Sequence, residues 1–140
     1  MAEPALLDTS ACFALLENEA GADVVEACLV EARAGNGVVH ASFVTLTGVV
    51  YIITQERGAA DAARALDLLK AWPVQWHHSD DTLCAEAAKL KARFRVSLAD
   101  AFVAATALRV DAVLVHKDPE FAALSGELRQ QVLPAKSAAR

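Results

Sequence analysis

Three aspartates occupy positions where their carboxylates could act together. Asp8 ends the apolar run 5–8. Asp118 lies three residues beyond the apolar run 112–115, and Asp100 lies in the first turn of the helix expected just before that run. In an open parallel sheet, the loops that leave the carboxyl ends of the strands converge on one edge. Three carboxylates at one edge repel one another unless a cation or shared protons compensate, which makes a site for a hard divalent metal ion plausible.

Each aspartate also has a purely structural explanation. Asp8 can cap the helix that follows it. Asp118 precedes Pro119, a common way to start a helix. The segment from Ser97 to Asp100 resembles a capping box, in which the acid would reach back to the backbone N–H of Ser97. From the residues alone, both the structural and the chemical interpretation stay open.

The elements that must position these acids alternate between strand and helix. Strands are expected at 5–8, 38–41, 74–77 and 112–115. Helices are expected at 11–17, 21–34, 42–56, 59–71, 80–94 and 98–108, with a short helical turn after position 118. This order predicts one α/β domain over residues 1–140, with three layers, a mainly parallel sheet and a frayed tail from about 135 to 140. A nucleotide-binding α/β domain is the other class, but no glycine-rich phosphate loop follows any expected strand.

The composition excludes several other classes of protein. Of the 140 residues, 55 % are hydrophobic, so intrinsic disorder is excluded. No apolar stretch reaches the roughly 18 residues needed to cross a bilayer. The first residues lack the basic start and apolar run of a secretory signal, so we expect a cytoplasmic protein without a membrane partner. The net charge of −5 argues against binding nucleic acid by bulk charge, so such a partner requires a basic patch or bound cations.

Nitrogen and sulfur side chains give no second metal motif. His77 and His78 are adjacent, so on a strand they point to opposite faces and cannot chelate one ion together. The cysteines are odd in number and widely spaced, which argues against a disulfide framework and a zinc site; they stand at positions 12, 28 and 84.

Four segments together carry a resemblance to a known family: LLDTSA at 6–11, ASFVTLTGVVYIITQERG at 41–58, VSLADAFVAATAL at 96–108, and AVLVHKDPEF at 112–121. The chain resembles the PIN-domain ribonucleases, and among them the VapC toxins of bacterial VapBC toxin–antitoxin pairs. The resemblance implies a PIN-like parallel sheet of four or five strands flanked by helices. It also implies that Asp8, Asp100 and Asp118 are catalytic and hold Mg²⁺ or Mn²⁺.

The same resemblance implies a function. The protein would be an Mg²⁺-dependent endoribonuclease toxin that hydrolyses RNA phosphodiesters and is inhibited by a VapB-like antitoxin. The cation would lower the pKa of a water molecule and neutralise charge in the transition state. The helical regions 11–34 and 42–71 carry more apolar side chains than one small core needs, Tyr51 among them, so we expect a homodimer and an antitoxin groove.

Gly48 departs from the family pattern, which places a glutamate at this position of the helix. Either the three aspartates suffice, or the chain is a catalytically weakened or inactive PIN-domain module that binds RNA or protein. Glu56 is about 12 Å farther along the helix, too far to substitute. Glu120 is a candidate auxiliary acid, although we expect it to be solvated. If position 48 faces the site, Gly48→Glu should raise metal affinity and cleavage.

Five further residues are candidates for contacts with the substrate. The hydroxyl or N–H groups of Thr9 and Ser10 could hold a phosphate at a helix start. His116 could contact a phosphate or a metal-bound water, although a strand-end histidine with a backbone partner is the simpler interpretation. Lys89 and Arg93 share a helical face that either meets the RNA backbone or is merely solvated.

Overall fold

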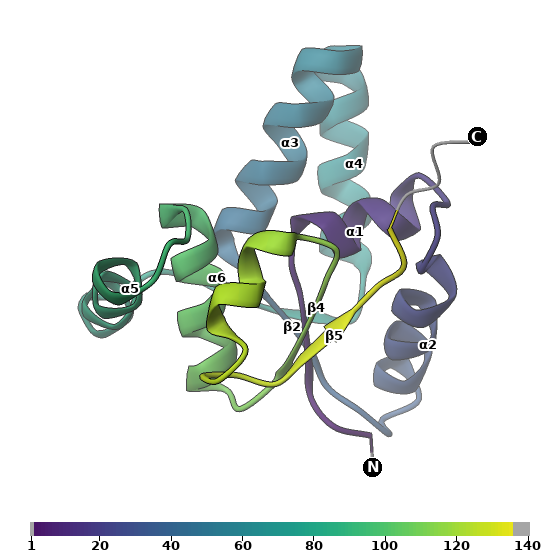
Figure 1. Ribbon diagram of the computed structural model, residues 1–140. Helices are drawn as coiled ribbons and strands as arrows, with labels where there is room; N and C mark the ends of the chain where they lie inside the picture. Colours follow the sequence, from purple (N-terminus) through teal and green to yellow (C-terminus); the bar gives the residue numbers. More distant parts are fainter. Residues whose placement is uncertain (1, 136–140) are drawn as a thin grey trace.

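The computed structural model describes residues 2–135 and has a three-layer α/β fold (Figure 1). Within this range, the sheet has the order β3-β2-β1-β4-β5, and every neighbouring pair is parallel. The strands are β1 (Ala5–Leu7), β2 (Val39–Ser42), β3 (Val74–His77), β4 (Val113–His116) and β5 (Gln130–Val132). The helices are α1 (Thr9–Leu16), α2 (Ala22–Arg33), α3 (Phe43–Arg57), α4 (Ala59–Ala71), α5 (Asp81–Arg93), α6 (Leu98–Arg109) and the 3-10 helix η1 (Pro119–Leu124). The predicted fold class is confirmed.

The sheet separates two hydrophobic cores. Because successive side chains of a strand point to opposite faces, β1 contributes to both. Ala5 and Leu7 pack with α1, α2, α3 and α4, whereas Leu6 packs with α5, α6 and η1. All three β1 side chains are buried, so the central strand is fixed between two layers of helices.

Polar side chains start the helices at the positions that the sequence predicts. Ser42 accepts a hydrogen bond from the N–H of Val44 at the start of α3, and Asp80 does so from Leu83 at the start of α5. Gly58, with φ of 93°, ends α3 and begins α4, a backbone geometry that favours glycine. Figure 1 shows α3 and α4 as a hairpin that extends beyond the sheet.

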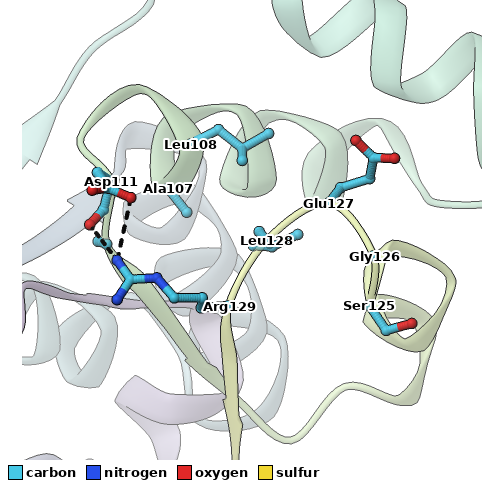
Figure 2. Close-up of a pocket in the computed structure, with 9 residues that line it drawn as sticks. Ala107, Leu108, Asp111, Ser125, Gly126, Glu127, Leu128 and Arg129 are labelled. Atoms are coloured by element: carbon cyan, nitrogen blue, oxygen red, sulfur yellow. Dashed lines mark hydrogen bonds and ion pairs between the residues drawn. The ribbon is translucent and has the colours of Figure 1, made fainter.

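Strand β5 was not among the segments expected from the sequence. It has only three residues and lies at the sheet edge, so it leaves little hydrophobic pattern. Tertiary contacts fix it instead: Arg129 donates from Nη2 to the backbone oxygen of Asp111 at 2.9 Å and to its carboxylate at 3.2 Å (Figure 2). This contact joins the start of β5 to the turn between α6 and β4.

The remaining differences are small shifts of boundaries. The strands expected at 38–41 and 112–115 each lie one residue later, at β2 and β4. Of the tail expected to be frayed, residues 136–140 lie outside the described part of the chain. Between residues 2 and 135, no helix is long and apolar enough to cross a membrane.

Candidate active site

Asp8 is both a helix cap and a buried acid. It follows β1, and the N–H of Ala11 donates to its Oδ1 at 2.8 Å at the start of α1. The Ser10 hydroxyl donates to the same carboxylate at 2.7 Å. Only 4 % of the residue is exposed, and this burial raises the pKa of Asp8 to about 6 despite the two hydrogen bonds, which act in the opposite direction. A carboxylate held in this way would gain from a nearby cation.

The carboxylates of Asp100, Asp118 and Glu120 form a cluster at the carboxyl end of the sheet. One oxygen from each lies within 4.8 Å of the others, and all three residues are half-buried. Burial, together with the hydrogen bond and charge of Asp118, raises the pKa of Asp100 to about 8. The helix α6 supplies Asp100, whereas the loop after β4 and the start of η1 supply the other two. Three acids crowded without a compensating charge repel one another, and a bound cation would relieve that repulsion.

Glu120 belongs to this cluster and is half-buried, whereas the sequence favoured a solvated residue. The backbone N–H of Ser97 donates to the Glu120 carboxylate, and the N–H of Glu120 donates to Asp118 Oδ1 at 2.9 Å. The capping box expected at α6 is therefore only half formed. Ser97 Oγ accepts from the N–H of Asp100 at 3.1 Å, but Glu120 and not Asp100 takes the Ser97 N–H. The spacing of Asp118-Pro119-Glu120 was the only signal in the sequence.

Ser10 and His116 hold the acids in place. The Ser10 hydroxyl accepts from the N–H of Lys117 at 2.9 Å while it donates to Asp8, so it joins the ends of β1 and β4. His116 is buried, and its Nδ1 accepts from the N–H of Asp118 at 3.0 Å. Its Nε2 therefore carries the proton and donates to the Gln130 side chain at 2.8 Å. Both residues position the acids, so the simpler interpretation of His116 agrees with the geometry.

Gly48 lines the candidate site, and it stands at the position where the family resemblance implies a glutamate. It lines a cavity of about 760 Å³ together with Asp8, Asp100, Asp118 and Thr9. A Cβ atom built at position 48 would lie only 2.6 Å from Thr9 Oγ1, which is closer than side-chain atoms tolerate. The side chain of Thr9 thus fills the space where a side chain at position 48 would begin.

The basic residues proposed to meet RNA lie outside the cavity. Lys89 and Arg93 are exposed on α5, and neither lines the cavity. Arg93 lies 3.7 Å from the carboxylate of Glu127, and its guanidinium covers the ring of Phe94. These contacts agree with a solvated helix face.

The donor set fits a hard divalent cation. Each side chain of the cluster offers carboxylate oxygen, the ligand type that Mg²⁺ and Mn²⁺ prefer, whereas zinc and copper favour nitrogen and sulfur. Among residues 2–135, the three clustered acids are the only group of this kind, and no histidine or cysteine joins them. Because the three acids are only half-buried, a cation held by them would keep positions open for water and a substrate oxygen.

The PIN domain family model matches residues 5–127, which is most of the chain. The protein therefore belongs to the PIN domain family. The matched range contains Asp8 and the three clustered acids Asp100, Asp118 and Glu120. No curated protein matches the chain by sequence.

Solved structures share the fold at low sequence identity. A chain of VapBC2 from Rickettsia felis, solved with a DNA fragment from its promoter, has a TM-score of 0.74 and 16 % identity; the match covers 94 % of this protein and 99 % of that chain. VapBC-5 from Mycobacterium tuberculosis gives 0.64 and 22 %, with 96 % and 100 % covered. VapC20 from Mycobacterium tuberculosis, a Sarcin-Ricin loop cleaving toxin, gives 0.68 and 17 %, with 93 % and 99 % covered.

Proposed function

We propose that this PIN domain is an endoribonuclease toxin of the VapC type that depends on Mg²⁺ or Mn²⁺ and is inhibited by a VapB-like antitoxin. The observation that carries the proposal is the cluster of Asp100, Asp118 and Glu120 beside Asp8, at the edge of a parallel sheet where ligands bind in such folds. The likeness to VapC20, which cleaves an RNA loop, supports RNA as the substrate.

In this proposal the acids have distinct tasks. Asp100, Asp118 and Glu120 hold the cation, and Asp8 completes the site from β1. When bound, the cation supplies a Lewis acid that neutralises phosphate charge and lowers the pKa of water. Ser10 fixes the orientation of Asp8, because its hydroxyl donates to that carboxylate.

Glu120 also bears on the alternative, an inactive PIN module that binds RNA or protein. That alternative rests on Gly48, since the family's helix glutamate is absent. Glu120 brings a carboxylate to the same cluster from η1. A fourth acid therefore favours the enzyme over the inactive module.

The partners proposed beside RNA are an antitoxin and a second copy of the chain. Three large hydrophobic residues are about half exposed on three helices: Val30 (53 %) on α2, Tyr51 (52 %) on α3 and Leu68 (54 %) on α4. Exposed apolar side chains of this size support interfaces on these helices. A cytoplasmic location accompanies this proposal.

The proposal is tested by cleavage of a single-stranded RNA with and without Mg²⁺ or Mn²⁺. We expect the wild type to cleave only with the cation, and Asp100→Asn to lower the rate by about two orders of magnitude, since even residues behind metal ligands contribute roughly 10- to 100-fold. Glu120→Gln should lower it by at least about tenfold. Asp67→Asn, an exposed aspartate on α4, serves as the matched control and should cleave normally.

Two outcomes decide against the enzyme. If the wild type binds RNA without cleaving it in either cation, the inactive module is correct. If Asp100→Asn cleaves as fast as the wild type, the acids of the cluster do not perform the reaction, and a contaminating nuclease explains the activity.

A further inference from the structure

The cavity beside the acids has a second, apolar wall. Besides the carboxylates, three aromatic side chains from two helices line it: Phe13 of α1, and Phe43 and Tyr51 of α3. With about 760 Å³, the cavity has room for more than a phosphate and a cation. Whatever binds at the acids therefore has an apolar group next to it.

Gly48 lies on the same helix as Tyr51 and lines the same cavity. The residues of α3 that line the cavity recur at helical spacing, and Gly48 lies about one turn, roughly 5 Å, before Tyr51 and Ile52. The Thr9 side chain occupies the space next to Gly48, so the path along the helix from the acids to Tyr51 runs past the Thr9 hydroxyl. Thr9 and Thr47 add hydroxyl groups along this path.

Tyr51 is the aromatic residue with a free face. The ring of Phe43 packs against Phe102 edge to face, with ring centres 5.3 Å apart, and Phe13 packs against the core. Tyr51 is 52 % exposed, and no ring or cation contact to it is found in the described part of the chain. An exposed planar ring at the edge of a cavity is a surface on which another planar group can stack.

We propose that the cavity binds the nucleobase next to the scissile phosphate of a single-stranded RNA, and that this base stacks on Tyr51. The inference rests on the proposed function and names how its substrate is held. The acids would hold the cation that binds the phosphate, and the neighbouring base would reach the ring of Tyr51 in the same cavity. Stacking of this kind tolerates any base but requires an unpaired strand, because the bases of a duplex are already stacked on one another.

The test compares intact and abasic RNA. The cleavage position of the wild type on a fluorescein-labelled octaribonucleotide is mapped first in Mg²⁺. Two further octamers then lack the base on either side of that phosphate. Equilibrium binding is measured in Ca²⁺, which also prefers oxygen ligands, for the wild type, Tyr51→Ala, Tyr51→Leu and Tyr51→Phe. Val132→Ala is the control, since Val132 is an exposed apolar residue of β5 that does not line the cavity.

We expect Tyr51→Ala to weaken binding of the intact RNA by about tenfold, within the range for loss of one base–aromatic stack. Tyr51→Leu should lose as much and Tyr51→Phe should bind like the wild type, because stacking needs a ring. On one of the two abasic octamers, the wild type and Tyr51→Ala should bind equally. Val132→Ala should bind every RNA normally.

The inference is overturned if Tyr51→Ala binds intact RNA as tightly as the wild type; the wall then serves another occupant, such as the antitoxin. It is also overturned if Tyr51→Ala loses the same factor on both abasic octamers, since the ring then does not contact a base. In either case normal cleavage by the wild type leaves the proposed function standing. A wild type that neither binds nor cleaves RNA overturns both.

Discussion

Gly48 and Thr9 share a volume that holds only one of their side chains. The close approach of Thr9 Oγ1 to the place of a Cβ at position 48 changes what a restored glutamate would do. From the sequence, Gly48→Glu was expected to raise metal affinity and cleavage. In the folded protein the new side chain must first displace Thr9, which belongs to the first turn of α1 next to Asp8.

We therefore predict that Gly48→Glu alone destabilises the protein by about 1–3 kcal/mol, the usual cost of overpacking. The double variant Thr9→Ala/Gly48→Glu should recover most of that loss, because the Thr9 Cβ atom lies at an acceptable 3.5 Å. Urea unfolding measures the stability, and calorimetry with Mn²⁺ measures whether the new carboxylate binds the cation. Thr9→Ala alone is the control. Equal stability of Gly48→Glu and the wild type would show that Thr9 moves without cost.

The protonation of Asp100 gives a second prediction at this scale. Since the pKa of Asp100 is raised to about 8, its carboxyl holds a proton at pH 7 that a cation must displace. Mn²⁺ binding at pH 7 should release about one proton, measured as a dependence of the calorimetric enthalpy on the buffer's ionisation enthalpy. The release should fall toward zero at pH 9.5, and affinity should rise between pH 6 and 8. A buffer-independent enthalpy at pH 7 would contradict this assignment.

Strands β2 and β3 are joined by a pair of histidines that the sequence did not reveal. His40 Nδ1 lies 2.8 Å from His77 Nε2, although His77 was considered only with its neighbour His78. Burial lowers the pKa of both histidines, with a further contribution from the charge of His77 on His40 and of Arg109 on His77. The hydrogen bond between the two rings requires that at least one of them is neutral, because only a neutral ring has a nitrogen that can accept.

The sign of the resulting pH dependence follows from these lowered pKa values. Stability that the neutral pair contributes is present above the ordinary histidine pKa of about 6.5 and is lost as the pH falls below it. Asp8 and Asp100 act in the opposite direction, because their raised pKa values make the fold more stable as the pH falls. We therefore expect the melting temperature of His77→Gln to gain more, or lose less, than that of the wild type when the pH falls from 7 to 5. Gln75→Ala, at an exposed position of the same strand β3, is the control. Asp80, whose pKa the hydrogen bond from Arg109 lowers, stays ionised over this range. An equal change in melting temperature in His77→Gln and the wild type would exclude the histidine pair as a source of the pH dependence.

The elements that follow local rules were predictable, and those that depend on distant contacts were not. Helix boundaries are indicated by residues within a few positions of them, such as the capping residues Ser42 and Ser97 and the glycine at position 58. Strand β5 depends on its pairing with β4, and Glu120 reaches the acids only because η1 packs against the start of α6. The positions of the three aspartates in the chain could be read from the pattern, but the placement of Glu120 beside Asp100 and Asp118 could not.

At the scale of the whole molecule, the net charge of −5 is partly concentrated in one place. Four carboxylates gather at one edge of the sheet, so the surface that RNA would approach repels phosphate until a divalent cation binds. The basic residues on α5 do not offset this, because they lie outside the cavity. Nucleic-acid binding by this chain should therefore depend on the divalent cation more than on monovalent salt.

The central place of β1 has a consequence for synthesis of the chain. This strand lies between β2 and β4. The acid that follows it, Asp8, lies near the start of the sequence, whereas Glu120 lies near its end. A nascent chain can pack α1 to α4 early, but β1 has no partner on its other side until β4 leaves the ribosome. The candidate active site therefore does not exist on a growing polypeptide until position 120 has emerged, and the ribosome that makes the protein faces no assembled nuclease before that moment.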